Sequence, residues 1–157
     1  MNTKKYCRQI RIISILAVFS SFIWLFWTLG RTYVIFIDPP KVSEGNEFVP
    51  LVLASGYAIF SVALVIFLGV FLYNQQRSLK NGALFSKRCE YALFAWTAIW
   101  PFYDICASNM DIIQRQHDMY DVFVVEGSTV GIPIIIFTFA LLYKIARQVA
   151  EENQLTI

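Results

Sequence analysis

Three charged side chains, Arg31, Asp104 and Glu126, lie within or beside segments that otherwise carry no charge. A charged group near the centre of a bilayer costs at least about 2.5–3.5 kcal/mol, so such groups face the protein interior and pair. At about 1.5 Å of rise per helical residue, the three residues fall in one outer layer, with Asp104 the deepest. Because Arg31 is the one cation available to both carboxylates, we expect an ion-paired clasp that holds three helices together. A polar site open to the outside is the alternative.

The other residues that could do chemistry form weaker patterns. His117, the single histidine, has Asp121 four residues later and Asp118 beside it, but a solvated acidic loop explains this spacing better than a metal site does. The three cysteines show no C-x-x-C spacing, which argues against a disulfide-exchanging enzyme. The sequence contains no phosphate-binding loop, nucleophile elbow or zinc-protease motif. We therefore expect no metal, no cofactor and no enzymatic activity.

Aromatic and small residues indicate how the segments pack. Four tryptophans form two pairs at helical spacing, namely Trp24 with Trp27 and Trp96 with Trp100. Aromatic residues at this spacing usually pack against neighbouring helices or lipid, and an aromatic-lined ligand pocket is the alternative. Gly127 and Gly131 stand four residues apart, which predicts a close helix contact at the outer end of the fourth segment.

The elements that must position these side chains are apolar helices. The 157 residues are 57% hydrophobic and 15% charged, whereas soluble domains average about 45–50% and about 25%. Four segments are long enough to cross a hydrocarbon core of about 30 Å, at about residues 12–37, 49–73, 91–110 and 122–146. The sequence therefore predicts an all-α polytopic membrane protein, with a single antiparallel four-transmembrane-helix bundle over residues 1–157. The net charge of +2 argues against direct binding of nucleic acid.

The lysines and arginines predict which side of the membrane each end faces. Ten of the 13 lie in the N-terminal segment, in the turn between the second and third helices, or at the C-terminal end. Short segments rich in these residues resist translocation. Both termini should therefore be cytoplasmic, with a cytoplasmic tail over residues 147–157.

Two short segments on that side carry a resemblance to a known family. Gly82-Ala83-Leu84-Phe85-Ser86 precedes the third helix, and Glu152-Asn153-Gln154-Leu155-Thr156-Ile157 ends the chain. These segments resemble the DUF2975 family of small four-helix bacterial membrane proteins of unknown function, although Gln154 replaces the usual acidic residue. The resemblance implies a multi-pass location in the bacterial inner (cytoplasmic) membrane. Because genes of that family often neighbour small helix-turn-helix regulators, it also implies a cytoplasmic regulatory partner.

The C-terminal tail ends on apolar residues, which is unusual for an extension that is merely solvated. We therefore expect a docking surface for a cytoplasmic partner, formed by Lys87, Arg88, Glu152, Asn153, Leu155 and Ile157. The function that this favours is a non-enzymatic partner-binding or regulatory element in the lipid bilayer. The alternative is a small transporter or channel subunit that uses the layer of Arg31, Asp104 and Glu126. Four helices enclose little volume, so the alternative would require a homo-oligomer or a second subunit.

Overall fold

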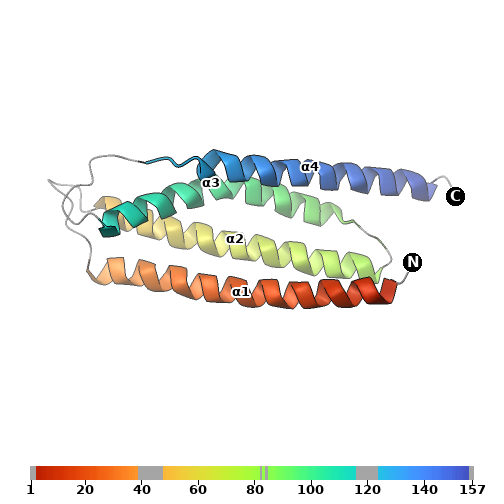
Figure 1. Ribbon diagram of the computed structural model, residues 1–157, viewed down its shortest axis with the longest axis horizontal. Coiled ribbons are helices and arrows are strands. Elements are labelled where there is room, and N and C mark those ends of the chain that lie inside the picture. The colour runs from red at the N-terminus through yellow and green to blue at the C-terminus, as the bar shows by residue number, and fades with distance from the viewer. Residues whose placement is uncertain (1–2, 39–47, 82, 84, 116–123, 156–157) are drawn as a thin grey trace.

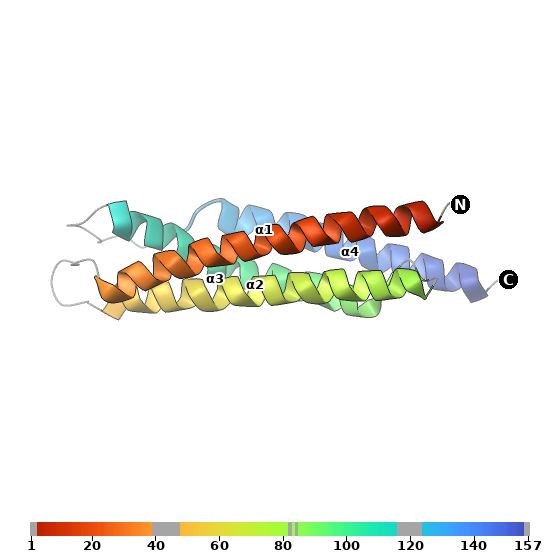
Figure 2. The same cartoon turned by 90° about the horizontal axis from the view of Figure 1, so that it is seen from below.

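The chain folds into four long helices that lie side by side. The computed structural model describes residues 3–38, 48–81, 83, 85–115 and 124–155. The helices are α1 (Thr3–Ile37), α2 (Phe48–Lys80), α3 (Lys87–Arg115) and α4 (Ser128–Leu155). Each helix packs against the next one in the chain, and consecutive helices run in opposite directions along the long axis, so the N and C ends lie at the same end of the molecule (Figures 1 and 2). The all-helical prediction is confirmed.

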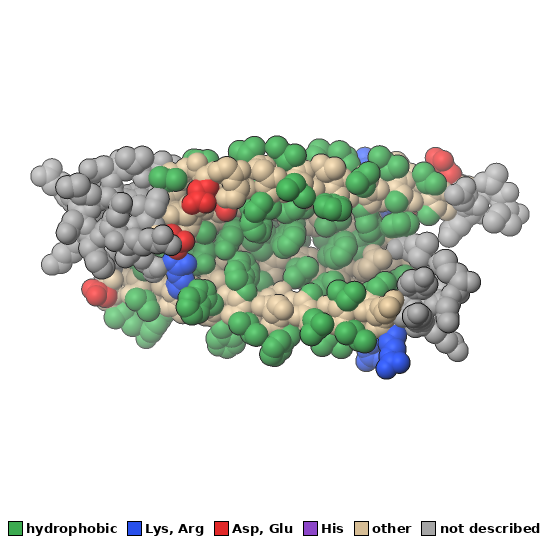
Figure 3. All heavy atoms as spheres, viewed as in Figure 1, with side chains coloured by type: hydrophobic (Ala, Val, Ile, Leu, Met, Phe, Trp, Pro, Cys, Tyr) green, Lys and Arg blue, Asp and Glu red, His purple; other side chains and the backbone are tan. Residues whose placement is uncertain are grey.

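Three of the helices are long and apolar enough to cross a membrane. The segments that qualify are Arg8–Ile37, Phe48–Lys80 and Ser128–Glu152. Large apolar side chains cover their outer faces, including Phe26, which is 78% exposed, and Phe48, which is 75% exposed. Figure 3 shows these apolar side chains along the length of the molecule, with the charged side chains towards its two ends. An apolar surface of this extent fits a lipid environment and not water.

The hydroxyl groups on the apolar helices are compatible with a lipid environment, because most of them form hydrogen bonds within their own helix. Ser20, Thr28 and Ser61 each donate a hydrogen bond to the carbonyl four residues earlier, at 2.6–2.9 Å. A hydroxyl bonded in this way adds no unsatisfied polar group to the helix surface. α1 and α2 therefore keep their apolar character despite these polar residues.

Helix α3 is the most polar of the four and lies between α2 and α4. Its buried side chains include Glu90, Asp104, Ser108 and Asn109. Its segment is not among those apolar enough to qualify as a span. Because α3 packs against both α2 and α4, its buried polar side chains are covered by the neighbouring helices.

The fourth helix begins later than the sequence predicts. The expected span starts at about residue 122, but residues 124–126 are not helical and α4 starts at Ser128. The reason is a side chain on α3, because Asn109 bonds both the backbone N–H and the carbonyl of Val124. That pairing takes up the backbone N–H and carbonyl of Val124 outside the helix, and α4 begins after it.

One close helix contact lies between α2 and α3. A Cβ atom added at Gly56 would lie 2.8 Å from the Cys106 Sγ atom, so this glycine permits the approach of the two helices. The glycines predicted to make such a contact do not, since a Cβ atom at Gly127 or Gly131 would meet nothing within 4 Å. The small-residue pattern on α4 therefore does not mark a helix interface within the described chain.

We expect Gly56→Ala to lower the free energy of unfolding by about 1–3 kcal/mol, because the added methyl group overpacks the contact with Cys106. The measurement is denaturant unfolding in detergent, followed by circular dichroism. Gly69→Ala on the same helix is the matched control, since a Cβ atom there meets open space. Adding Cys106→Ala to the Gly56→Ala variant should restore much of the loss. Equal stability of the two glycine variants would contradict the prediction.

Candidate functional site

The deepest of the predicted polar residues, Asp104, is buried between α3 and the start of α4. Its side chain is 8% exposed. The Oδ2 atom accepts hydrogen bonds from the hydroxyls of Ser128, at 2.9 Å, and Thr129, at 2.6 Å. These two residues form the first turn of α4, where the helix dipole favours a negative charge. Asp104 therefore joins α3 to α4 through hydroxyl groups.

The predicted cation of that layer, Arg31, pairs with a different carboxylate. Its guanidinium donates to the Asp111 carboxylate and lies over the Tyr57 ring, 5.9 Å from the ring centroid. Asp111 follows Asp104 by seven residues, or about two helical turns towards the outer end. The ion pair therefore joins α1 to α3 nearer the surface than the predicted clasp, and the Asp111 side chain is 45% exposed.

Glu126, the third predicted residue of the layer, is exposed. It precedes α4, and its Oε2 atom lies 3.5 Å from the Ser128 hydroxyl. The Ser128 hydroxyl therefore lies near the carboxylates of both Glu126 and Asp104. Arg31 forms its ion pair with Asp111. Counting residues along each helix gives depth but not the stagger between helices, which explains why the observed pairing differs from the predicted one.

Two polar contacts that join α3 to α4, or to the segment before it, were not predicted from the sequence; we call them polar anchors. The first is Asn109, which is fully buried and whose amide also donates to the Ile105 carbonyl at 2.8 Å. The signal that could have found it is an uncharged amide inside an apolar segment, since such a group also needs partners in lipid. Attention to charged residues alone misses it.

The second unanticipated anchor is an ion pair at the opposite end of the molecule. The Arg147 Nε atom lies 3.0 Å from the Glu90 Oε2 atom, and the side chains are 12% and 7% exposed. Arg147 also donates to Glu151, one turn later, at 2.6 Å. This network fixes α4 against the start of α3.

A tyrosine reinforces the same junction. The Tyr143 hydroxyl donates to the Gln75 Oε1 atom at 2.8 Å and accepts from the Ser86 N–H at 2.9 Å. The Tyr143 ring also packs edge-on against Phe85, with centroids 5.2 Å apart. One side chain of α4 therefore contacts the end of α2 and the turn that leads into α3.

The predicted docking residues are described only in part, and no described contact joins those on α3 to those on α4. Lys87 and Arg88 are exposed on the first turn of α3, and Glu152 is exposed near the end of α4. The side chains of Asn153 and Leu155 and the whole of Ile157 lie outside the description, as do His117, Asp118 and Asp121 of the acidic loop.

Three of the four tryptophans surround one cavity. Trp24, Trp96 and Trp100 line a space of about 330 Å³ between α1, α2 and α3. The Trp96 Nε1 atom donates to the Leu64 carbonyl at 3.1 Å, whereas the buried Trp100 Nε1 atom has no partner. Trp27 points outwards and is 69% exposed. The aromatic residues thus line a hollow of the size that small apolar ligands occupy.

We expect Thr129→Val to lower the free energy of unfolding by about 1–3 kcal/mol, because the buried Asp104 carboxylate loses a hydrogen-bond donor. Thr138→Val is the matched control on the same helix, since its exposed hydroxyl bonds only its own backbone, at Ile134. The measurement is a double-mutant cycle with Asp104→Ala, in which the effect of Thr129→Val should shrink. An equal loss with and without Asp104 would show that the two side chains are not coupled.

Comparison with known protein families, with characterised proteins and with solved structures gives no match to this chain. The resemblance to the DUF2975 family therefore stays a prediction, and the function must be argued from the geometry described above.

Proposed function

We propose that the chain crosses the bacterial inner membrane four times, with α3 as the additional span and both termini in the cytoplasm. The alternating direction of the helices supports this proposal, because it brings the N and C ends to one end of the molecule (Figure 1). The polar side chains of α3 do not oppose it, since α2 and α4 cover them. The distribution of Lys and Arg selects that end as the cytoplasmic one.

In this setting the protein acts as a non-enzymatic element that binds a cytoplasmic regulatory protein. The observation that carries this proposal is the buried Glu90–Arg147 ion pair at the base of the tail. α4 continues as a helix from there to Leu155, or about 12 Å beyond the pair. Figures 1 and 2 show this end of α4 extending past the neighbouring ends of α1 and α2. A helical arm of this kind presents a preorganised surface, which lowers the entropic cost of binding.

The charges near the arm favour a partner with mixed or acidic character. Lys87 and Arg88 are exposed on the first turn of α3, the turn that Arg147 contacts through Glu90, and Glu151 and Glu152 are exposed on α4 itself. Complementary charges of this kind fix the orientation of a partner and speed its encounter. The apolar end of the tail would supply the buried centre of the contact.

A small transporter or channel subunit is the second candidate, and Asp104 is the observation that favours it. A buried carboxylate held by two hydroxyls at membrane depth resembles a proton- or cation-binding group. Flux into liposomes that Asp104→Asn abolishes would select this function over partner binding.

We expect both termini to react with a thiol reagent from the cytoplasmic side alone. The first variant replaces Cys89 and Cys106 with alanine, so that Cys7 is its single cysteine. The second variant replaces all three cysteines with alanine and carries its single cysteine after Ile157. A membrane-impermeant maleimide should label both in inside-out vesicles and neither in spheroplasts. Phe48→Cys, at the exposed start of α2, is the control and should show the opposite pattern. Labelling of the two termini from different sides would overturn the four-span topology.

We expect a photo-crosslinking amino acid at Arg88 or at Glu152 to capture the same cytoplasmic protein in cells. Deletion of residues 153–157 should abolish both adducts, and Arg147→Ala should weaken them because the arm loses its anchor. Lys144→Ala is the control for removal of a nearby positive charge, and position 26, which faces lipid, is the control for the crosslinker. Adducts that survive the deletion, or that differ between the two positions, would contradict the docking surface.

A further inference from the structure

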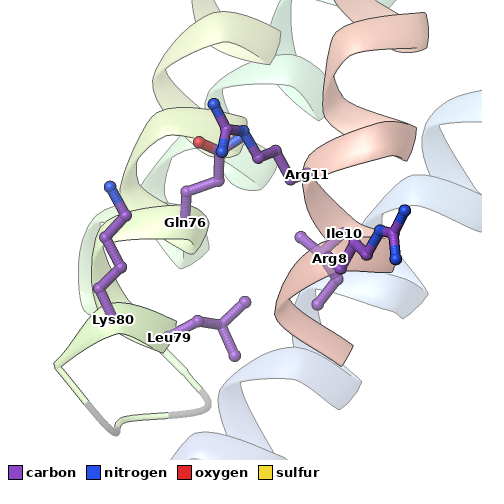
Figure 4. Close-up of a pocket in the computed structure, with 6 residues that line it drawn as sticks. All are labelled: Arg8, Ile10, Arg11, Gln76, Leu79 and Lys80. Carbon is purple, nitrogen blue, oxygen red and sulfur yellow. The ribbon is translucent and has the colours of Figure 1, made fainter. Parts of the chain in front are cut away.

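A basic pocket lies between the first turns of α1 and the last turns of α2, at the end of the molecule where both termini lie. It has a volume of about 380 Å³. Its lining residues are Arg8, Ile10, Arg11, Gln76, Leu79 and Lys80. Figure 4 shows the Arg11 side chain extending from α1 towards Gln76 on α2, with Lys80 on the α2 side, whereas the Arg8 guanidinium points away from α2. Two helices therefore contribute cations to one hollow.

These cations have no counter-charge among the residues that the structure describes. The ion pairs of the described chain involve Arg31 and Arg147, and none involves Arg8, Arg11 or Lys80. All three of these side chains are exposed. An anion placed between Arg11 on α1 and Lys80 on α2 would supply the missing counter-charge.

An apolar groove continues from the pocket along the same two helices. It has a volume of about 430 Å³ and shares Gln76 with the basic pocket. Its walls include Phe19 and Phe22 of α1 and Leu72 of α2. The distance along the α1 axis from Arg11 to Phe22 is about 16 Å, which is close to half the thickness of a hydrocarbon core of about 30 Å.

The groove wall also contains a polar atom that lacks a partner. Ser14 lines the groove, its side chain is 3% exposed, and its hydroxyl makes no hydrogen bond. Most other hydroxyls of α1 bond a carbonyl of their own helix, so this one is an exception. It lies three residues, or about 4.5 Å, further along α1 than Arg11, so its hydroxyl can donate to a ligand whose anionic end contacts Arg11.

We propose that α1 and α2 bind one anionic diacyl phospholipid. Arg11 and Lys80 contact its phosphate, and an acyl chain lies in the groove beside Phe19 and Leu72. A free phosphate would leave the groove empty, and a neutral lipid would leave the cations without a counter-charge. The proposal depends on the membrane location of the helices and is independent of the docking partner at α4.

The test measures lipid binding by native mass spectrometry of the full chain, purified in neutral detergent with dioleoyl phosphatidylglycerol or dioleoyl phosphatidylcholine. The wild-type protein should retain one phosphatidylglycerol at concentrations where phosphatidylcholine does not bind. Arg11→Gln should weaken this binding about five-fold, and the double variant Arg11→Gln/Lys80→Gln about 25-fold. Arg77→Gln is the matched control, because it removes a charge from the same end of α2 outside the pocket.

A second variant tests the groove separately from the charges. Gly69 lines the groove, and a Cβ atom there meets nothing within 4 Å, so Gly69→Leu fills the space without displacing the backbone. It should reduce binding of phosphatidylglycerol, whereas Gly30→Leu, at an equally open position on α1 outside the groove, should not.

Three outcomes would overturn the proposal. An equal loss in Arg77→Gln and Arg11→Gln would show a general effect of surface charge. Full displacement of the lipid by inorganic phosphate, with no effect of Gly69→Leu, would show a site for a free anion. Equal retention of the two lipids would show that the cations do not select the headgroup. None of these results bears on the crosslinking of a cytoplasmic protein at α4, so the two proposals fail independently.

Discussion

The fold depends on one constraint, which is that polar groups buried among apolar helices need their partners within the protein. Among the described residues, helix α3 carries both buried carboxylates and the buried amide of Asn109, and it lies between two apolar helices that cover them. Asp104 and Asn109 bind the start of α4 and the segment before it, and Glu90 binds Arg147 near the other end of α4. Hydrogen bonds and ion pairs therefore hold α3 and α4 together at both ends, where two apolar surfaces would gain little from contact in lipid.

Helix α1 is held in a different way and leaves more open space. Its backbone packs along α2, and it reaches α3 through side chains, with the Trp24 ring edge-on to Tyr103 and Arg31 paired with Asp111. The aromatic cavity lies on one side of this contact, and the apolar groove with its basic end is lined by α1 and α2. These hollows thus border α1, which makes fewer described polar contacts with its neighbours than α3 does.

The two binding surfaces that we propose lie on different pairs of helices. The arm of α4 rests on the ion pair with α3, and the basic pocket lies between α1 and α2. The residues of one surface make no contribution to the other. Binding of a lipid at α1 and α2 therefore does not require any change at the arm.

The sequence by itself determined the helical class, the apolar character and the approximate length of the helices, because hydrophobic runs and the distribution of charge are properties of the chain alone. It also identified Asp104 and Arg31 as residues that need partners. Only the tertiary structure decided which partners they have, since the stagger between helices places Asp111 beside Arg31 and the hydroxyls of α4 beside Asp104. The late start of α4 and the role of Gly56 were undetermined for the same reason, because both depend on what the neighbouring helix places opposite them.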